Sequence, residues 1–202
     1  MLKQIAFLRQ AQKSMGKVLA VIPLAPNHWT VLSFLIALAG GIMIALYNEL
    51  IMGLVLFAVA AVFDMVDGAV ARARGQVSKL GGFIDGVADR FVEGIFLLSL
   101  MFYPLPTIFI DAKIWLAAVI FLGTCMPAYV RAYADHKEVL SKKKALALGG
   151  ICERSERLII LIIGLATGLL YSMDYFVYSL ILVSLLSLIT ILQRFVNIVK
   201  SG

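Results

Sequence analysis

Six apolar segments of about 20 residues, separated by short polar stretches, decide what this chain can fold into. They lie at roughly 29–48, 51–72, 82–103, 113–134, 155–172 and 174–198. A helix needs about 20 predominantly apolar residues to cross the hydrocarbon core of a bilayer. Hydrophobic residues make up 62% of the chain, which excludes an ordinary soluble domain. The spacing therefore predicts an all-α polytopic membrane protein with six transmembrane helices.

The residues ahead of the first span follow a different pattern. Basic residues alternate with apolar ones from residue 3 to 20, and Pro23 and Pro26 follow. This pattern predicts an amphipathic helix within residues 1–25 that lies at the membrane surface. Residues 26–200 are then expected to form one six-helix bundle, so that residues 1–202 make a single membrane domain.

The distribution of basic residues orients the predicted spans. Six successive spans would place the connecting segments on the two sides of the membrane in turn. In that arrangement, all of the 18 lysines and arginines except Lys113 fall on the same side. Cytoplasmic segments of membrane proteins are rich in lysine and arginine. We therefore expect a multi-pass protein of the cell membrane with both termini in the cytoplasm. Topology and contact with anionic lipids account for the net charge of +6, so nucleic acid is not an expected partner.

Four aspartates interrupt the apolar pattern of the second and third spans. Asp64 and Asp67 are spaced i, i+3, and Asp85 and Asp89 are spaced i, i+4, so each pair lies on one face of its helix. Carboxylates inside a membrane are costly and are functional candidates by default. Because the two spans form a hairpin, we expect all four near its cytoplasmic end. Oxygen ligands of this kind suit Mg²⁺ or Mn²⁺.

Arg72 and several small residues surround the predicted acidic cluster. Arg72 can offer a planar fork to a phosphate. The small residues, which allow close approach of a ligand, are Gly68, Ala71, Gly81, Gly82 and Gly86. Two divalent cations would neutralise the four carboxylates and leave positive charge for a diphosphate. The pattern therefore predicts phosphoryl transfer assisted by two metal ions.

The same residues carry a resemblance to a known family. The pattern Asp64-x2-Asp67-Gly68-x2-Ala71-Arg72-x8-Gly81-x3-Asp85-x3-Asp89 resembles the signature of the class I CDP-alcohol phosphotransferases at all eight fixed positions. The sequence Pro26-Asn27-x-x-Thr30 is also similar to the start of the first span in that family.

This resemblance implies a reaction and a set of roles. Asp64, Asp67 and Asp85 would bind two ions of Mg²⁺ or Mn²⁺, and Asp89 would share one of them. Asp89 would also act as the general base that takes the proton of an acceptor hydroxyl, whose oxygen attacks the β-phosphorus of a CDP-linked lipid while CMP leaves. The residues implied for the CDP site are Asp64, Asp67, Asp85, Gly68, Ala71, Arg72, Gly81, Gly82 and Thr30. The resemblance also implies a homodimer.

A second basic group bears on the acceptor. It comprises Arg131, Arg154, Arg157 and Arg194, at or inside the ends of the later spans. Half-buried arginines need anionic partners, so the group favours a small phosphorylated alcohol as acceptor. The surrounding pattern is similar to the branch of the family that makes phosphatidylinositol phosphate or archaetidylinositol phosphate. One departure is Tyr133, where that branch usually has a second basic residue.

Other functions stay open on the sequence alone. Glycerol 3-phosphate or another polar alcohol is an alternative acceptor, and a CDP-polyol is an alternative donor. From a different class, a cation-coupled transporter would also use carboxylates in a membrane. Transporters usually place such sites at the midplane of internal repeats, and this chain shows no repeat. The favoured prediction is a phosphatidyltransferase of phospholipid biosynthesis.

Overall fold

The structure is a computed structural model that describes residues 26–76, 78–140 and 148–201. All regular elements in these ranges are helical, so the expected all-α class is confirmed for this part of the chain. The predicted surface helix, within residues 1–25, lies outside the described residues. The chain divides into two compact units, residues 1–103 and 104–202, which are described in turn.

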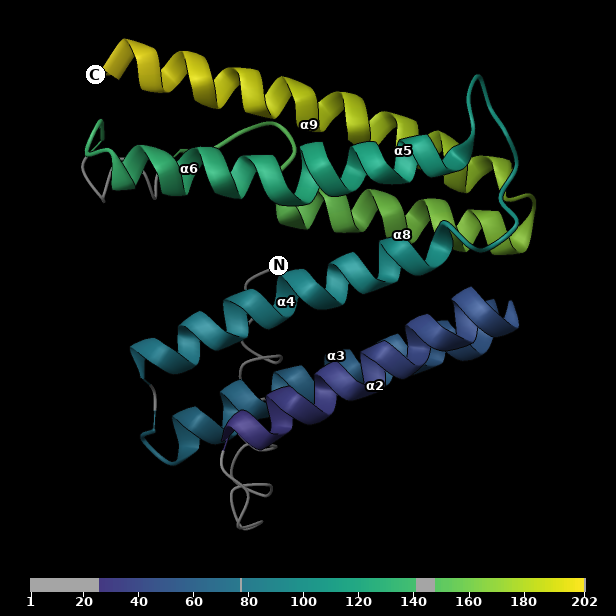
Figure 1. The fold of residues 1–202 in the computed structure, drawn as a ribbon, viewed down its shortest axis with the longest axis horizontal. Helices are drawn as coiled ribbons and strands as arrows, with labels where there is room; N and C mark the ends of the chain where they lie inside the picture. Colours follow the sequence, from purple (N-terminus) through teal and green to yellow (C-terminus); the bar gives the residue numbers. More distant parts are fainter. Residues whose placement is uncertain (1–25, 77, 141–147, 202) are drawn as a thin grey trace, which may run out of the picture. The chain divides into compact units, whose positions relative to one another are not determined.

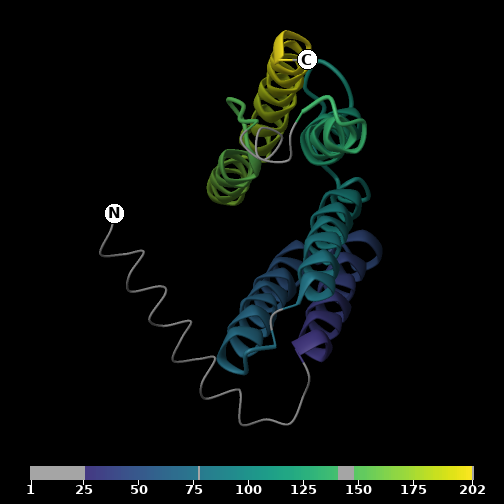
Figure 2. The same cartoon turned by 90° about the vertical axis from the view of Figure 1, so that its left-hand side faces the viewer.

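The described part of the first unit is built from three helices (Figure 1). They are α2 (Pro26–Tyr47), α3 (Leu50–Ala73) and α4 (Lys79–Leu100). Only Asn48 and Glu49 link α2 to α3, and Asn48 has a φ of 57°, in the left-handed region that Asn tolerates better than most residues. Such a short link makes α2 and α3 antiparallel neighbours, and α2 also packs against α4 (Figure 2).

Glycines allow α2 to approach both partners closely. A Cβ at Gly40 would lie 3.1 Å from the carbonyl oxygen of Gly53 in α3, and one at Gly41 would lie 2.7 Å from the side chain of Ile95 in α4. On α3, a Cβ at Gly53 would run into the side chain of Ile44. Small residues at helix crossings are the usual means of close packing in membranes.

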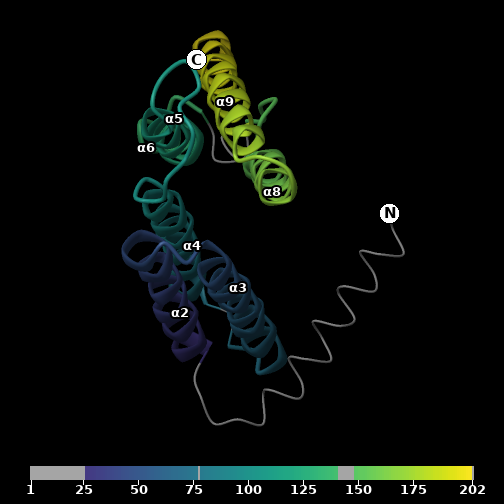
Figure 3. The same cartoon turned by 90° about the vertical axis from the view of Figure 1, so that its right-hand side faces the viewer.

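The second unit contains a long rod and two further helices. The rod is continuous and consists of α5 (Ala112–Ala118), a π-helical segment η1 (Val119–Cys125) and α6 (Met126–His136). The others are α8 (Arg154–Leu170) and α9 (Asp174–Ser201). Figure 3 shows α9 beside both α8 and the rod. Its first four turns supply much of the unit's fully buried core, including Phe176, Leu180 and Val183.

Four helices are long and apolar enough to cross a membrane. They are His28–Tyr47, Leu50–Ala73, the rod Ala112–His136 and Asp174–Lys200. The structure also has helices at the other two expected spans. However, α4 carries five charged residues, and α8 has only 17 residues. The described part of this membrane protein is therefore all-helical, with four candidate spans.

A glycine pair provides a test of the α2–α3 crossing. Gly53→Ala should lower the melting temperature in detergent, because the added methyl group also comes within 2.9 Å of the Gly40 carbonyl oxygen. Overpacking of this kind costs about 1–3 kcal/mol. Gly94→Ala in α4 is the matched control, since a Cβ there meets nothing within 4 Å. It should leave the melting temperature unchanged or raise it. Equal effects of the two substitutions would contradict this account of the crossing.

Candidate functional site

Three of the four predicted aspartates meet at one end of the first unit. Asp64 and Asp67 lie in the last three turns of α3, and Asp85 lies in the second turn of α4. One carboxylate oxygen from each lies within 4.8 Å of the other two. Asp67 is buried, Asp64 is half-buried and Asp85 is exposed. Carboxylates this close repel one another unless a cation lies between them. Three oxygen donors of this kind fit Mg²⁺ or Mn²⁺.

The α3–α4 turn explains why these aspartates meet. Gly75 takes a φ of 66°, and the N–H of Gln76 donates to the carbonyl of Ala71 at 2.9 Å. Ser78 then caps α4, because its hydroxyl accepts the N–H of Gly81 at 2.9 Å. We did not single out Ser78 from the sequence, although a serine just before a helix is a common start signal.

The first turn of α2 is attached to Asp67. The hydroxyl of Thr30 donates a hydrogen bond to Oδ2 of Asp67, and both side chains are buried. Beside this bond, the ring of Trp29 packs on Phe63 with centroids 5.8 Å apart and also contacts Val66. The start of α2 therefore lies at the same level as the acidic cluster.

Asp89 lies one helical turn beyond Asp85 and is half-buried. Its carboxylate is not one of the three whose oxygens lie within 4.8 Å of one another, but its negative charge interacts with that of Asp67. One further turn along, Glu93 is buried, and its carboxylate lies 3.7 Å from the guanidinium of Arg90.

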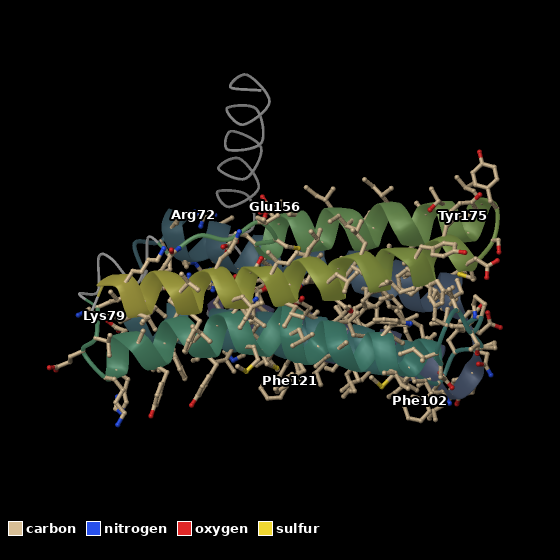
Figure 4. The ribbon with its side chains drawn as sticks, turned by 90° about the horizontal axis from the view of Figure 1, so that it is seen from above. Arg72, Lys79, Phe102, Phe121, Glu156 and Tyr175 are labelled. Carbon is tan, nitrogen blue, oxygen red and sulfur yellow. The ribbon has the colours of Figure 1, made fainter. Side chains whose placement is uncertain are left out.

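Arg72 and the glycines lie close to the acidic residues. A Cβ at Gly68 would lie 3.3 Å from the guanidinium of Arg72, so the glycine leaves room for this exposed side chain to fold back along α3. In Figure 4, Arg72 and Lys79 lie at one end of the α3–α4 hairpin, and Phe102 lies beyond its other end. A Cβ at Gly82 would meet nothing within 4 Å, so the backbone of α4 is accessible there.

Two of the four predicted acceptor arginines are buried in the second unit. Arg157 and Arg194 are each 3% exposed. Arg157 donates to the carbonyl of Gly123, which lies in the π-helical segment of the rod. Arg194 donates to the carbonyl of Pro127 and, at 2.7 Å, to both carboxylate oxygens of Glu153. The two guanidiniums therefore bind successive turns of the rod.

The loop ahead of α8 is attached to α9 at the same place. The N–H of Cys152 donates to the hydroxyl of Thr190 at 2.9 Å, and the N–H of Ile151 donates to Oε1 of Gln193 at 3.2 Å. Burial raises the pKa of the Cys152 thiol. The high pKa favours an unreactive thiol.

The remaining basic residues of this group lie nearer the surface. Arg131 on α6 and Arg154 at the start of α8 are half-buried. Tyr133, the departure noted above, stacks on Tyr129 with ring centroids 5.4 Å apart. The ammonium of Lys137 lies 5.6 Å from the centre of the Tyr133 ring. A cation is thus present beside the position where a basic residue was expected.

Comparisons with known proteins agree with this architecture. The chain is 36% identical to the archaetidylinositol phosphate synthase of Pyrococcus horikoshii over 93% of this chain and 90% of that protein. It is 27% identical to the phosphatidylinositol phosphate synthase of Corynebacterium glutamicum over 92% and 83%.

Solved structures show the same fold. The phosphatidylinositol phosphate synthase of Mycobacterium tuberculosis with CDP-DAG bound superposes with a TM-score of 0.75, at 23% identity and with 94% of each chain covered. A second crystal structure of that enzyme, in complex with manganese and citrate, has the same TM-score and identity and covers 94% of this chain and 89% of that one.

A family model settles the classification. The model of the CDP-alcohol phosphatidyltransferases matches residues 23–196, a range that includes the acidic cluster and all four arginines. The chain therefore belongs to the CDP-alcohol phosphatidyltransferase family.

Proposed function

We propose that this protein transfers a phosphatidyl-type group from a CDP-linked lipid to the hydroxyl of an inositol phosphate and releases CMP. The observation that carries the proposal is the cluster of Asp64, Asp67 and Asp85, whose carboxylate oxygens lie within 4.8 Å of one another. The names of relatives that match nearly the whole chain support this choice of acceptor. A product of this kind is a phospholipid precursor.

The aspartates would hold the metal. Asp64, Asp67 and Asp85 would bind divalent cations, Mg²⁺ or Mn²⁺, and we propose two ions with Asp89 sharing one of them. When bound, such ions neutralise the charge of a diphosphate and of its leaving group. Manganese in the related Mycobacterium tuberculosis structure supports a divalent ion. Asp67 is buried and Asp85 is exposed, so the bound ions would lie at the boundary between the protein interior and its surface.

The CDP moiety would lie on the surface formed by α3 and α4. The guanidinium of Arg72, folded over Gly68, would donate to a phosphate oxygen. Ala71 on α3 would line the same pocket. Gly81 and Gly82 would let the nucleotide approach the backbone of α4, which is open at Gly82.

Asp89 would act as the general base. It is half-buried, one turn from Asp85, and it does not belong to the tightest group of carboxylates. A carboxylate in this position can accept the proton of the acceptor hydroxyl while the oxygen attacks the β-phosphorus. The bond from that phosphorus to the CMP oxygen then breaks, and CMP leaves.

The arginines of the second unit would bind the phosphate of the acceptor. Arg194 supplies the strongest support, because its Nε is buried and has no hydrogen-bond acceptor among the described residues. A buried donor without a partner costs about 1–3 kcal/mol, so an anionic ligand would satisfy it. Arg154 and Arg131 are half-buried and would contact the same phosphate. Arg157, held on the Gly123 carbonyl, would complete the group.

We also propose that α4 and α8 cross the membrane with the four apolar helices. Charges on α4 would then be tolerated because they belong to the site. The active site and both termini would face the cytoplasm of a cell-membrane protein, as the distribution of basic residues favours. The two units would form one domain, since the family match runs through both. A homodimer is the proposed assembly.

Release of CMP by purified protein in detergent tests the reaction. The assay contains Mg²⁺, either CDP-diacylglycerol or CDP-archaeol, and one acceptor at a time: inositol 1-phosphate, glycerol 3-phosphate, inositol or serine. We expect CMP release only when the acceptor is inositol 1-phosphate, and we expect EDTA to abolish this release. Release only with glycerol 3-phosphate would mean that the reaction is as proposed but that glycerol 3-phosphate is the acceptor. A lack of release with every pair, together with metal-dependent ion flux in liposomes, would favour the transporter alternative.

Asp89→Asn tests the base. Turnover should fall by about 10²- to 10⁴-fold, because the amide cannot take the proton. Binding of the CDP-lipid should change little. Asp111→Asn is the control, since it makes the same change of charge in the second unit while asparagine still caps α5. Full activity of Asp89→Asn would exclude Asp89 as the base.

Arg131→Ala tests the acceptor site. The acceptor KM should rise about tenfold or more, since a charged hydrogen bond contributes about 1.5–3 kcal/mol, while the donor KM stays within about twofold. Lys113→Ala removes one positive charge from the first turn of the same rod and should change neither constant. Equal increases in both KM values for Arg131→Ala would argue against an acceptor site at this residue.

A further inference from the structure

Thr30 at the start of α2 holds one of the predicted metal ligands. We infer that Thr30 is a positioning residue, which orients the carboxylate of Asp67 for a divalent cation. The inference rests on the proposed function, because it assigns the cation to the aspartate cluster. The family resemblance also implied a place for Thr30 in the CDP site, and the lone pairs of its hydroxyl stay available there.

The hydrogen bond between Thr30 and Asp67 has a fixed direction. An ionised carboxylate only accepts hydrogen bonds, so the hydroxyl of Thr30 must donate to Oδ2 of Asp67. A hydroxyl has one proton, and this bond uses it. Thr30 is 8% exposed and Asp67 is 6% exposed, so little water competes for either group. The other oxygen of Asp67 remains for a cation.

The neighbours of Thr30 keep its hydroxyl in place. On one side, Trp29 packs against Phe63 and Val66 of α3. One turn further along α2, the hydroxyl of Ser33 donates to the carbonyl of Ala60 at 2.8 Å. Threonine is also stiff at χ1 within a helix. The first turns of α2 are therefore fixed against α3 on both sides of the hydroxyl.

This arrangement has a measurable effect on metal binding. Partners that hydrogen-bond to a metal ligand orient it, and their loss typically weakens metal affinity by 10–100-fold. Without the bond, the carboxylate of Asp67 would be free to rotate and would meet the negative charges of Asp64 and Asp85 in a poorer orientation. Metal affinity should therefore fall when the Thr30 hydroxyl is removed.

Mn²⁺ titration in the absence of any CDP compound tests the inference. Free Mn²⁺ is followed by electron paramagnetic resonance with full-length protein in detergent. Thr30→Val, which keeps the shape and removes the hydroxyl, should weaken Mn²⁺ binding about tenfold or more. Thr30→Ser, which keeps the hydroxyl, should stay within about threefold of the unsubstituted protein.

Ser33→Ala provides the matched control. It removes another buried hydroxyl that links α2 to α3, but that hydroxyl bonds to a backbone carbonyl and not to an acid. Its Mn²⁺ affinity should match that of the unsubstituted protein, and any general loosening of α2 would appear equally in both variants as a lower melting temperature.

Two results would overturn the inference, and they differ. Unchanged Mn²⁺ affinity in Thr30→Val would exclude Thr30 as a positioning residue for Asp67 and leave the proposed function intact. Failure of the unsubstituted protein to bind Mn²⁺, or equal binding by Asp64→Asn, would remove the metal site itself and the inference with it.

Discussion

Repulsion between like charges is the constraint on which the first unit depends. Three carboxylates with oxygens within 4.8 Å of one another, one of them buried, are costly in a chain built for lipid. Several features around them hold them in place. The short α3–α4 turn brings the two helices together, Ser78 starts α4, and Thr30 fixes the most buried of the three acids.

In the second unit, carbonyl oxygens and a carboxylate stabilise buried positive charge. The buried arginines of this unit donate to carbonyls of the rod, one in the π-helical segment and one at Pro127. Glu153, at the start of α8, neutralises Arg194 with both of its oxygens.

Much of this architecture follows from local rules. Hydrophobic periodicity placed all six long helices within a few residues of their positions, because about 20 apolar residues leave few alternatives. The spacing of Asp64, Asp67 and Asp85 predicted their meeting, since a hairpin fixes which helix faces oppose each other. The π-helical segment and the carbonyl partners of Arg157 and Arg194 were not predicted. They depend on contacts between residues 34 and 67 positions apart, and no local pattern encodes those contacts. The bond from Thr30 to Asp67 spans 37 positions for the same reason.

The irregular stretch of the rod around Gly123 and Pro127 is linked to a distant position in the chain. The backbone follows the π pattern up to Cys125, Pro127 has no N–H to donate, and Arg157 donates to the Gly123 carbonyl from α8. A relative with a regular α-helix and an ordinary residue at position 127 would satisfy that carbonyl within the rod and relax the need for an arginine at position 157. The two positions should therefore vary together in evolution. Their covariation would reflect a backbone carbonyl that lacks a donor within the rod and the arginine that supplies one, independently of any ligand that the arginine contacts.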